Sequence, residues 1–140
     1  MPELFRLSVL TPVRSVFDAE VISIVAPGSE GYLGVLAHHA PLITALAPGR
    51  LTVKVPDEDD LVFCVSGGFL EVSDNRAVVL ADALELPEEI DLARAKGARD
   101  RARERLRDTS GKIDQARAEA ALRRALNRIR VFEGAATKAR

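Results

Sequence analysis

Short apolar, β-branched runs follow one another through the first 87 positions, and turn residues separate them. The runs lie at residues 4–10, 13–17, 20–25, 51–55, 61–65, 69–72 and 77–80. We expect turns at the acidic segment 56–60, at Gly67–Gly68 and at Ser73–Asn75. Many short strands with no helical stretch between them predict an antiparallel β-sandwich rather than parallel βαβ units.

From Pro87 onward the pattern changes to one of helical period. Pro87 suits the first position of a helix, and Ala, Arg, Leu and Glu, all strong helix formers, dominate the residues that follow. A break at the polar segment 108–111 predicts two antiparallel helices, the second from about 113 to 132. One apolar stripe holds Leu92, Ala95, Ala102 and Leu106, and the other holds Leu122, Leu126 and Ile129. The fold class is therefore α+β, with a β-sandwich domain at 1–86 and a helical hairpin at 87–140.

Composition and charge divide at the same place. Residues 1–87 have a net charge of −7 and 35 large apolar side chains, whereas residues 88–140 have a net charge of +6 and only 9. Such asymmetry indicates two structural units with different partners. Each buried Leu adds only about 1.5–3 kcal/mol to the free energy of packing. Helices with so few large apolar residues should therefore dock weakly on each other and on the sandwich. We expect a hairpin that stays helical and can exchange docking partners.

The location expected from the sequence is intracellular. A single cysteine, Cys64, excludes a disulfide framework and a cysteine-based metal cage, and a buried, inert thiol is the expected state. No apolar run approaches the roughly 20 residues that cross a bilayer, and the N-terminus lacks the features of a signal peptide. Contact with a membrane is therefore expected only through a partner, without direct insertion.

Few residues offer catalytic chemistry. The glycine-rich segment 28–34 is neither a dinucleotide fingerprint nor a P-loop, and we interpret its glycines as turn residues. His38 and His39 are adjacent and should point to opposite faces, which makes them poor joint metal ligands or acid–base partners. Ser66 lacks a nucleophile elbow and a positioned base. The sequence thus predicts no metal site, no required cofactor and no active site; a hydrolase that uses His38 or His39 is the disfavoured alternative.

Arginines form a stripe on each predicted helix, roughly opposite the leucine stripe. The first stripe holds Asp91, Arg94, Arg101 and Arg105, and the second holds Arg117, Arg124 and Arg128. Three interpretations stay open: a solvated face with helical charge pairs, a surface that docks on an acidic protein, or a site for a polyphosphate. Nucleic acid is disfavoured by the sequence pI of about 6.1 and by the lack of aromatic residues beside the stripes.

Linked motifs along the chain resemble a known family, the epsilon subunit of F-type proton-translocating ATP synthases of the bacterial type. They lie at 31–36, 39–44, 48–49, 66–72, 78–82, 90–95 and 117–122. The resemblance spans nearly the whole chain in order and implies the same two domains. It implies a non-catalytic subunit of the rotor stalk, with the gamma subunit, the c-ring and the alpha and beta subunits as partners. Peripheral attachment on the cytoplasmic side of the bacterial plasma membrane follows from it.

The resemblance also assigns residues and a regulatory role. Glu30 matches the segment of the family that contacts the c-ring, and His39 lies on the side associated with gamma. The hairpin of the family inhibits ATP hydrolysis when it extends, and some bacterial members bind ATP on the folded hairpin. The matching positions here are Glu85, Asp91, Arg94, Ala95, Arg101, Arg124 and Arg128. ATP is therefore expected as a regulatory ligand, with its need for magnesium left open. The alternative function is a stand-alone intracellular ATP-sensing module.

Overall fold

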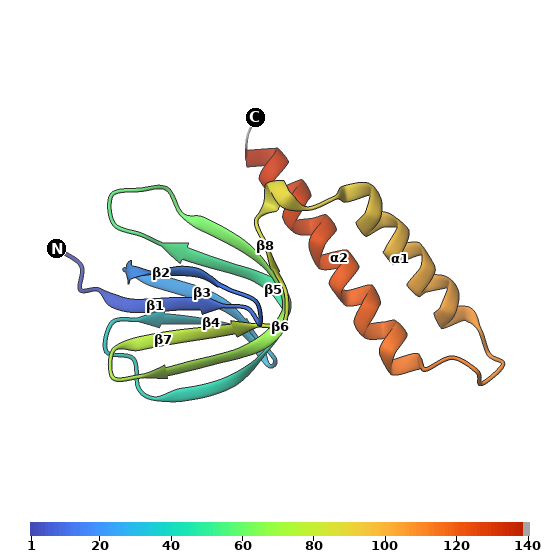
Figure 1. Cartoon of the computed structure of the whole chain (residues 1–140), viewed down its shortest axis with the longest axis horizontal. Coiled ribbons are helices and arrows are strands. Elements are labelled where there is room, and N and C mark those ends of the chain that lie inside the picture. The colour runs from blue at the N-terminus through green and yellow to red at the C-terminus, as the bar shows by residue number, and fades with distance from the viewer. Residues whose placement is uncertain (139–140) are drawn as a thin grey trace. The chain divides into compact units, whose positions relative to one another are not determined.

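The computed structural model describes residues 1–138, which divide into a β-sheet unit, Met1–Glu85, and a helical unit that begins at Leu86 (Figure 1). The strands are β1 (Phe5–Leu10), β2 (Ser15–Val21), β3 (Ser23–Gly28), β4 (Gly31–Leu36), β5 (Leu42–Lys54), β6 (Leu61–Ser73), β7 (Arg76–Ala81) and β8 (Leu84–Glu85). Their order in the sheet is β2-β1-β7-β6-β5-β3-β4, and β8 pairs with β6. All pairs are antiparallel except β1 with β7, which is parallel. The predicted sandwich is confirmed.

Two long strands connect the layers of the sandwich. The first half of β5 and the second half of β6 pair with each other, and β7 continues that layer toward β1 and β2. The second half of β5, from Pro48, pairs with the first half of β6, up to Ser66. Together with β3, β4 and β8, these halves form the second layer. Figure 1 shows the strong curvature that results. β5 and β6 therefore pass from one layer to the other as continuous strands.

The core lies between these layers and consists of alternate side chains. The largest side chains that are fully buried are Phe5, Leu7, Ile24, Leu51 and Leu70, which come from both layers. Because successive residues of a strand point to opposite faces, one residue of slip would expose this whole set. The alternation therefore fixes the register of the sheet.

Local predictions for the sandwich were only partly right. Gly28 and Gly31 do flank a turn, at 29–30, as interpreted, but Gly34 lies inside β4, a strand that the sequence did not predict. The first half of β5 was missed, because the prolines at 41 and 48 interrupt its apolar pattern. Gly67–Gly68 is not a hairpin turn; it lies inside β6, where both residues have positive φ and the strand bends. The turns at the acidic segment 56–60 and at Asp74–Asn75 are confirmed.

The helical unit contains a short 3-10 helix, η1 (Pro87–Glu89), and two long helices, α1 (Leu92–Arg107) and α2 (Gln115–Lys138). The prediction that Pro87 begins the first long helix was wrong, because the chain is extended at Ile90 and Asp91. Asp91 is the N-cap of α1, and its Oδ1 accepts from the backbone N–H of Arg94 at 3.0 Å. A carboxylate at that place offsets the positive end of the helix dipole.

The two helices form the predicted hairpin, and alanine is the commonest of its buried residues. The buried residues of α1 are Ala95 and Ala102. Between residues 115 and 135, those of α2 are Ala118, Ala125, Asn127, Ile129 and Val131. A buried methyl group contributes far less than a buried Leu, so each alanine adds little to the free energy of packing. The helical hairpin is confirmed, and its weak packing stays a prediction.

Candidate functional site

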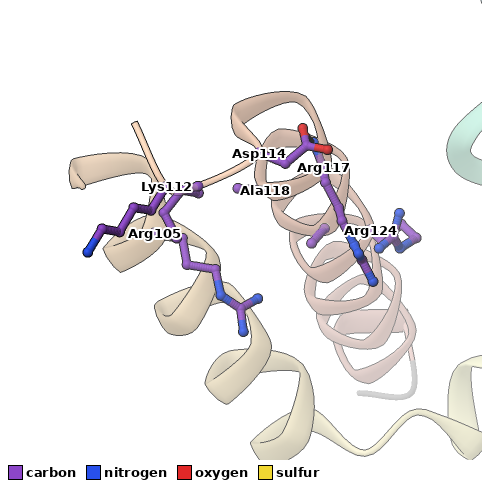
Figure 2. A pocket seen from close by; sticks show the side chains of 8 residues that line it. Arg105, Lys112, Asp114, Arg117, Ala118 and Arg124 are labelled. Atoms are coloured by element: carbon purple, nitrogen blue, oxygen red, sulfur yellow. Dashed lines mark hydrogen bonds between the residues drawn. The ribbon is translucent and has the colours of Figure 1, made fainter. Parts of the chain in front are cut away.

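A cleft opens between the helices at the end of the hairpin where the chain turns. It has a volume of about 580 Å³ and is lined by Arg105, Lys112, Ile113, Asp114, Arg117, Ala118, Ala121 and Arg124. We call it the turn cleft. Figure 2 shows the Arg105 side chain reaching from α1 toward α2, while Arg117 and Arg124 come from the facing helix. Ala118 and Ala121 add little bulk to the lining, so its long side chains are mainly cationic.

The charges of the turn cleft are unbalanced. Arg105, Lys112, Arg117 and Arg124 contribute four cations, and Asp114 is the one carboxylate in the lining. Within residues 1–138, none of these four cations forms an ion pair with a carboxylate within 4.0 Å. The Asp114 carboxylate already accepts from the backbone N–H of Arg117 at 3.1 Å. The lining therefore has an excess of positive charge, which attracts anions.

A smaller hollow of about 280 Å³ adjoins the turn cleft and shares Arg105 and Ile113 with it. Its other lining residues are Arg101, Glu104 and Asp108. The pKa of Asp108 is lowered because the Ser110 side chain and backbone N–H donate to its carboxylate, the latter at 2.8 Å. The charges of this hollow balance, which leaves the turn cleft as the more anion-attracting of the two.

The sequence predicted that the arginine stripes lie opposite the leucine stripes; in the structure the arginines flank the buried alanines. Arg117 and Arg124 line the same cleft as the buried Ala118, because neighbouring residues on a helix differ by only about 100°. Of the lining cations, Arg105, Arg117 and Arg124 belong to the predicted stripes. Lys112 was missed, since it lies in the connection and has no helical period.

Three of the residues matched to ATP binding lie at the first turn of α1. Asp91 caps the helix, Arg94 is exposed, and Ala95 is buried with its N–H bonded to the Asp91 carbonyl at 3.0 Å. The contact between the Asp91 carboxylate and the backbone N–H of Arg94 is the ordinary hydrogen bond of a helix N-cap. These residues lie at the end of α1 opposite the turn.

The remaining members of the predicted ATP set are spread over the two units. Arg101 lines the smaller hollow, and Arg124 lines the turn cleft. Arg128 is half-buried one helical turn further along α2. Glu85 belongs to the sandwich unit, where it pairs with Cys64 across β8 and β6. The structure thus places Arg101 and Arg124 in two adjoining hollows of the hairpin.

Glu30 and His39 flank β4 at its two ends. Glu30 is exposed in the turn between β3 and β4, next to Ser29, whose N–H donates to the Ala45 carbonyl at 2.9 Å. His39 lies in the connection between β4 and β5, with Nδ1 2.7 Å from the Ala40 carbonyl oxygen. Six residues of strand span about 20 Å. The two side chains can therefore contact different partners.

An exposed apolar surface covers the outer side of the layer formed by β5, β6 and β7. Its main members are Ile43, Phe69 and Leu80, whose exposed fractions are 74%, 56% and 49%. Phe69 is paired with Ala45 on one side and Leu80 on the other, so Ala45, Phe69 and Leu80 form one row across three strands, and Ile43 lies in the next row opposite Glu71. We call this surface the outer apolar face. Exposed contiguous apolar surface of this kind is typical of protein–protein contacts.

A second exposed apolar group lies on β3 and β4. Val25, Tyr32 and Leu36 point outward there, and the Tyr32 hydroxyl accepts from the Arg50 N–H at 3.0 Å. This group lies on the other layer of the sandwich. The sequence analysis identified neither apolar surface, because it compared strands one at a time without their register.

The two histidines have separate structural contacts. His38 has a left-handed backbone (φ 62°), donates its N–H to Asn75 Oδ1 at 2.7 Å, and places Nε2 3.1 Å from the Glu3 carboxylate.

Cys64 is fully buried, as expected. Over residues 1–138 no group of three His, Cys, Asp or Glu side chains is placed to hold a metal ion. Nor is any helix in that range both long and apolar enough to cross a membrane.

Both units of the chain match known protein families. Residues 4–87 match the beta-sandwich domain of the ATP synthase delta/epsilon chain, and residues 88–133 match its long alpha-helix domain. The chain belongs to the ATP synthase epsilon family. The ATP synthase epsilon chain of Pelotomaculum thermopropionicum is 54% identical over 101 residues, which is 72% of this chain and 75% of that one. That of Protochlamydia amoebophila is 48% identical over 103 residues, 74% and 70% of the two chains.

Solved structures agree with this membership. A chain of the Euglena gracilis mitochondrial ATP synthase, from a structure of OSCP, F1 and c-ring, superposes with a TM-score of 0.81 at 26% identity. The superposition covers 96% of this chain and 82% of that one. A chain of the Tetrahymena thermophila central stalk and c-ring has the same fold, with a TM-score of 0.60 at 19% identity over 96% and 97% of the two chains. The chain is thus an epsilon-type subunit of an F-type ATP synthase and not its catalytic subunit.

Proposed function

We propose that the chain is a rotor-stalk subunit that joins the catalytic head of a proton-translocating ATP synthase to its membrane c-ring, with no active site of its own. Family membership over both units carries the proposal. The sandwich binds the gamma subunit through the outer apolar face, and His39 contacts gamma beside it, four residues before Ile43. Glu30, exposed at the other end of β4, contacts the c-ring. The complex holds the chain peripherally on the cytoplasmic side of a bacterial plasma membrane.

The hairpin is the regulatory part of this proposal. In its extended form it reaches the alpha and beta subunits and inhibits ATP hydrolysis. Four of the residues buried in its helices are alanines, and each of them adds little to the free energy of packing that opposes separation of the helices. A net charge of +6 on residues 88–140 favours docking on an acidic surface, because complementary charge steers and orients association.

ATP is the proposed regulatory ligand of the closed hairpin. Arg101 from α1 lines the smaller hollow, and Arg124 from α2 lines the adjoining turn cleft. Arg94 lies in the first turn of α1, and Arg128 lies one turn beyond Arg124 on α2. Opposed arginines repel each other unless an anion lies between them, so a triphosphate stabilises the closed state. The titration described below compares ATP binding with and without magnesium.

Inhibition is tested with the soluble catalytic head stripped of its epsilon subunit. Adding the full-length chain should lower the ATPase rate several-fold, because the extended hairpin blocks rotation. A chain that ends at Leu86 should bind the head and leave its rate unchanged. Far-UV circular dichroism of the shortened chain checks that the sandwich still folds. Equal inhibition by both chains would show that the hairpin is not the inhibitory element.

Nucleotide binding is tested by calorimetric titration of the isolated chain with ATP, with and without magnesium. We expect saturable binding that Arg94→Ala weakens at least tenfold. Arg103→Ala, an exposed arginine on the same helix, serves as the matched control and should bind as the wild type does. An absence of heat at millimolar ATP would contradict nucleotide binding. Co-purification with gamma separates the stalk subunit from a stand-alone ATP sensor, which needs no such partner.

A further inference from the structure

We propose that Asn75 is a positioning residue for the contact with the gamma subunit. Its side chain holds the connection between β4 and β5 in the conformation that presents His39 to gamma. The inference rests on the gamma contact proposed above and adds a residue that acts through it. Asn75 itself lies in the tight turn between β6 and β7, 37 residues from the neighbouring His38 along the chain.

The side chain of Asn75 joins two segments that are distant in sequence. Its Oδ1 accepts from the backbone N–H of His38 at 2.7 Å, and its Nδ2 donates to the Leu4 carbonyl oxygen at 3.0 Å. A backbone N–H bonds to the amide oxygen and a carbonyl oxygen to the amide nitrogen, so both contacts require the same orientation of the side chain. The Asn75 carbonyl also accepts from the Arg6 N–H at 3.3 Å. The amide therefore fixes the β4–β5 connection to the turn of another hairpin and to the residue before β1.

The turn between β6 and β7 does not by itself explain an asparagine. Asp74 and Asn75 are its two central residues and have φ 50° and 58°. Hairpin turns with positive φ at both positions most often have glycine at the second one, because glycine adopts that conformation without strain. Asparagine tolerates it better than most other residues. The asparagine therefore keeps the turn and adds a side chain whose two hydrogen bonds are used elsewhere.

His38 has a backbone conformation that needs such a bond. The Leu36 carbonyl accepts from the His39 N–H at 3.2 Å, which closes a four-residue turn around Ala37 and His38. Of these two, only His38 has positive φ, at 62°, which is the pattern of a type II turn, whose third position favours glycine. A left-handed backbone at a residue with a Cβ costs free energy and persists where its surroundings hold it. Asn75 supplies that hold, because it bonds the N–H of the strained residue itself.

The direction of the His39 side chain depends on this turn. His39 Nδ1 lies 2.7 Å from the Ala40 carbonyl oxygen, so Nδ1 carries the proton and donates it. Over residues 1–138 the other ring nitrogen, Nε2, has no hydrogen bond, which leaves that atom for gamma. A change in the backbone dihedral angles of His38 rotates the backbone that carries His39. Loss of the Asn75 amide therefore weakens the gamma contact without Asn75 touching gamma.

A second contact of His38, with Glu3, is the weaker one. His38 Nε2 lies 3.1 Å from Glu3 Oε2, and the two side chains are 67% and 73% exposed. Ion pairs with that exposure contribute little, and this one exists only while the imidazole is protonated. Glu3→Gln removes the ion pair and leaves the amide contact in place. It is therefore the matched control for changes at Asn75.

The test measures binding of the full chain to a soluble catalytic head that contains gamma and lacks its epsilon subunit, by surface plasmon resonance. Asn75→Gly removes the amide and keeps a residue that favours the left-handed turn, so the affinity should fall about five- to tenfold. Glu3→Gln should bind within twofold of the wild type. Urea unfolding followed by Tyr32 fluorescence verifies that the sandwich of each variant is folded.

Three further variants separate positioning from a general structural role. Asn75→Asp keeps an oxygen for the His38 N–H and loses the donor to Leu4, so its affinity should stay within about threefold of the wild type. His38→Gly, added to Asn75→Gly, should restore binding, because glycine adopts φ 62° without strain. In a His39→Ala background, Asn75→Gly should cost no further affinity beyond twofold, because the residue through which it acts is gone.

Three results would overturn the inference and leave the gamma contact of His39 standing. Wild-type affinity of Asn75→Gly, with His39→Ala weakened, would show that the connection keeps its conformation without the amide. Equal losses from Asn75→Gly with and without His39→Ala would show that Asn75 does not act through His39. A lack of restoration by His38→Gly would show that the amide does not offset strain at His38. Full affinity of His39→Ala alone would instead contradict the proposed gamma contact itself, and the inference with it.

Discussion

Replacement of Gly68 by alanine is expected to destabilise the sandwich by at least about 4 kcal/mol, which is a large part of the stability of an ordinary domain. Gly68 has φ 138°, a backbone conformation that residues with a Cβ rarely adopt. A Cβ there would also overlap the carbonyl oxygen of Leu80 on the neighbouring strand. The backbone of β7 would have to move, and the pairing of β6 with β7 holds one layer together.

Gly31 supplies the matched control for this substitution. Its φ of 133° is nearly the same, but nothing lies within 4 Å of the position of an added Cβ. Gly31→Ala should therefore cost only the backbone strain, about 1–3 kcal/mol. The difference between the two variants measures the steric part alone.

Tyr32 provides the readout for both variants. It is the only tyrosine, the chain has no tryptophan, and it lies on β4 of the sandwich unit. Urea unfolding followed by Tyr32 fluorescence therefore reports the sandwich, while circular dichroism at 222 nm reports mainly the helices. A Gly68→Ala midpoint equal to that of Gly31→Ala would show that the strand bend tolerates a side chain.

The sequence predicted the two units because their periodicities differ and each persists over many residues. It failed where glycine and proline occur inside strands, as at Gly67–Gly68 and Pro48. Residues that permit positive φ are most common in turns, so a bend that keeps its pairing cannot be told from a turn by composition. Whether the chain forms a turn or a bend within a paired strand depends on the partner strands, which are distant in sequence.

The candidate site was predicted only in part for a similar reason. Helical period placed Arg105 and Arg117 in stripes, yet it did not indicate that the stripes meet across a cleft. That depends on which sides the antiparallel helices turn toward each other, and the small Ala118 lets the neighbouring arginines approach. Lys112 joins the cleft through the turn, where no period applies. The outer apolar face likewise depends on register across three strands.

The double variant Phe69→Asp/Leu80→Asp is expected to abolish docking of the chain on the gamma subunit, with at least a 100-fold loss of affinity. Burying a large apolar side chain is worth about 1.5–3 kcal/mol, and every 1.4 kcal/mol is a factor of ten. The two side chains are neighbours across β6 and β7 at the centre of the outer apolar face. New carboxylates would also have to lose their hydration in the interface. Both residues are half-exposed, so the fold itself should lose little stability.

Val13→Asp is the matched control, because Val13 is 87% exposed and lies between β1 and β2, outside the face. It should bind a gamma-containing head like the wild type in a pull-down or by surface plasmon resonance. The second apolar group offers the competing assignment, since Tyr32 and Leu36 are also exposed on the other layer. If Tyr32→Asp/Leu36→Asp abolishes docking and Phe69→Asp/Leu80→Asp does not, gamma binds the β3–β4 layer. In that case Glu30, which directly precedes β4, would lie beside the gamma contact rather than apart from it.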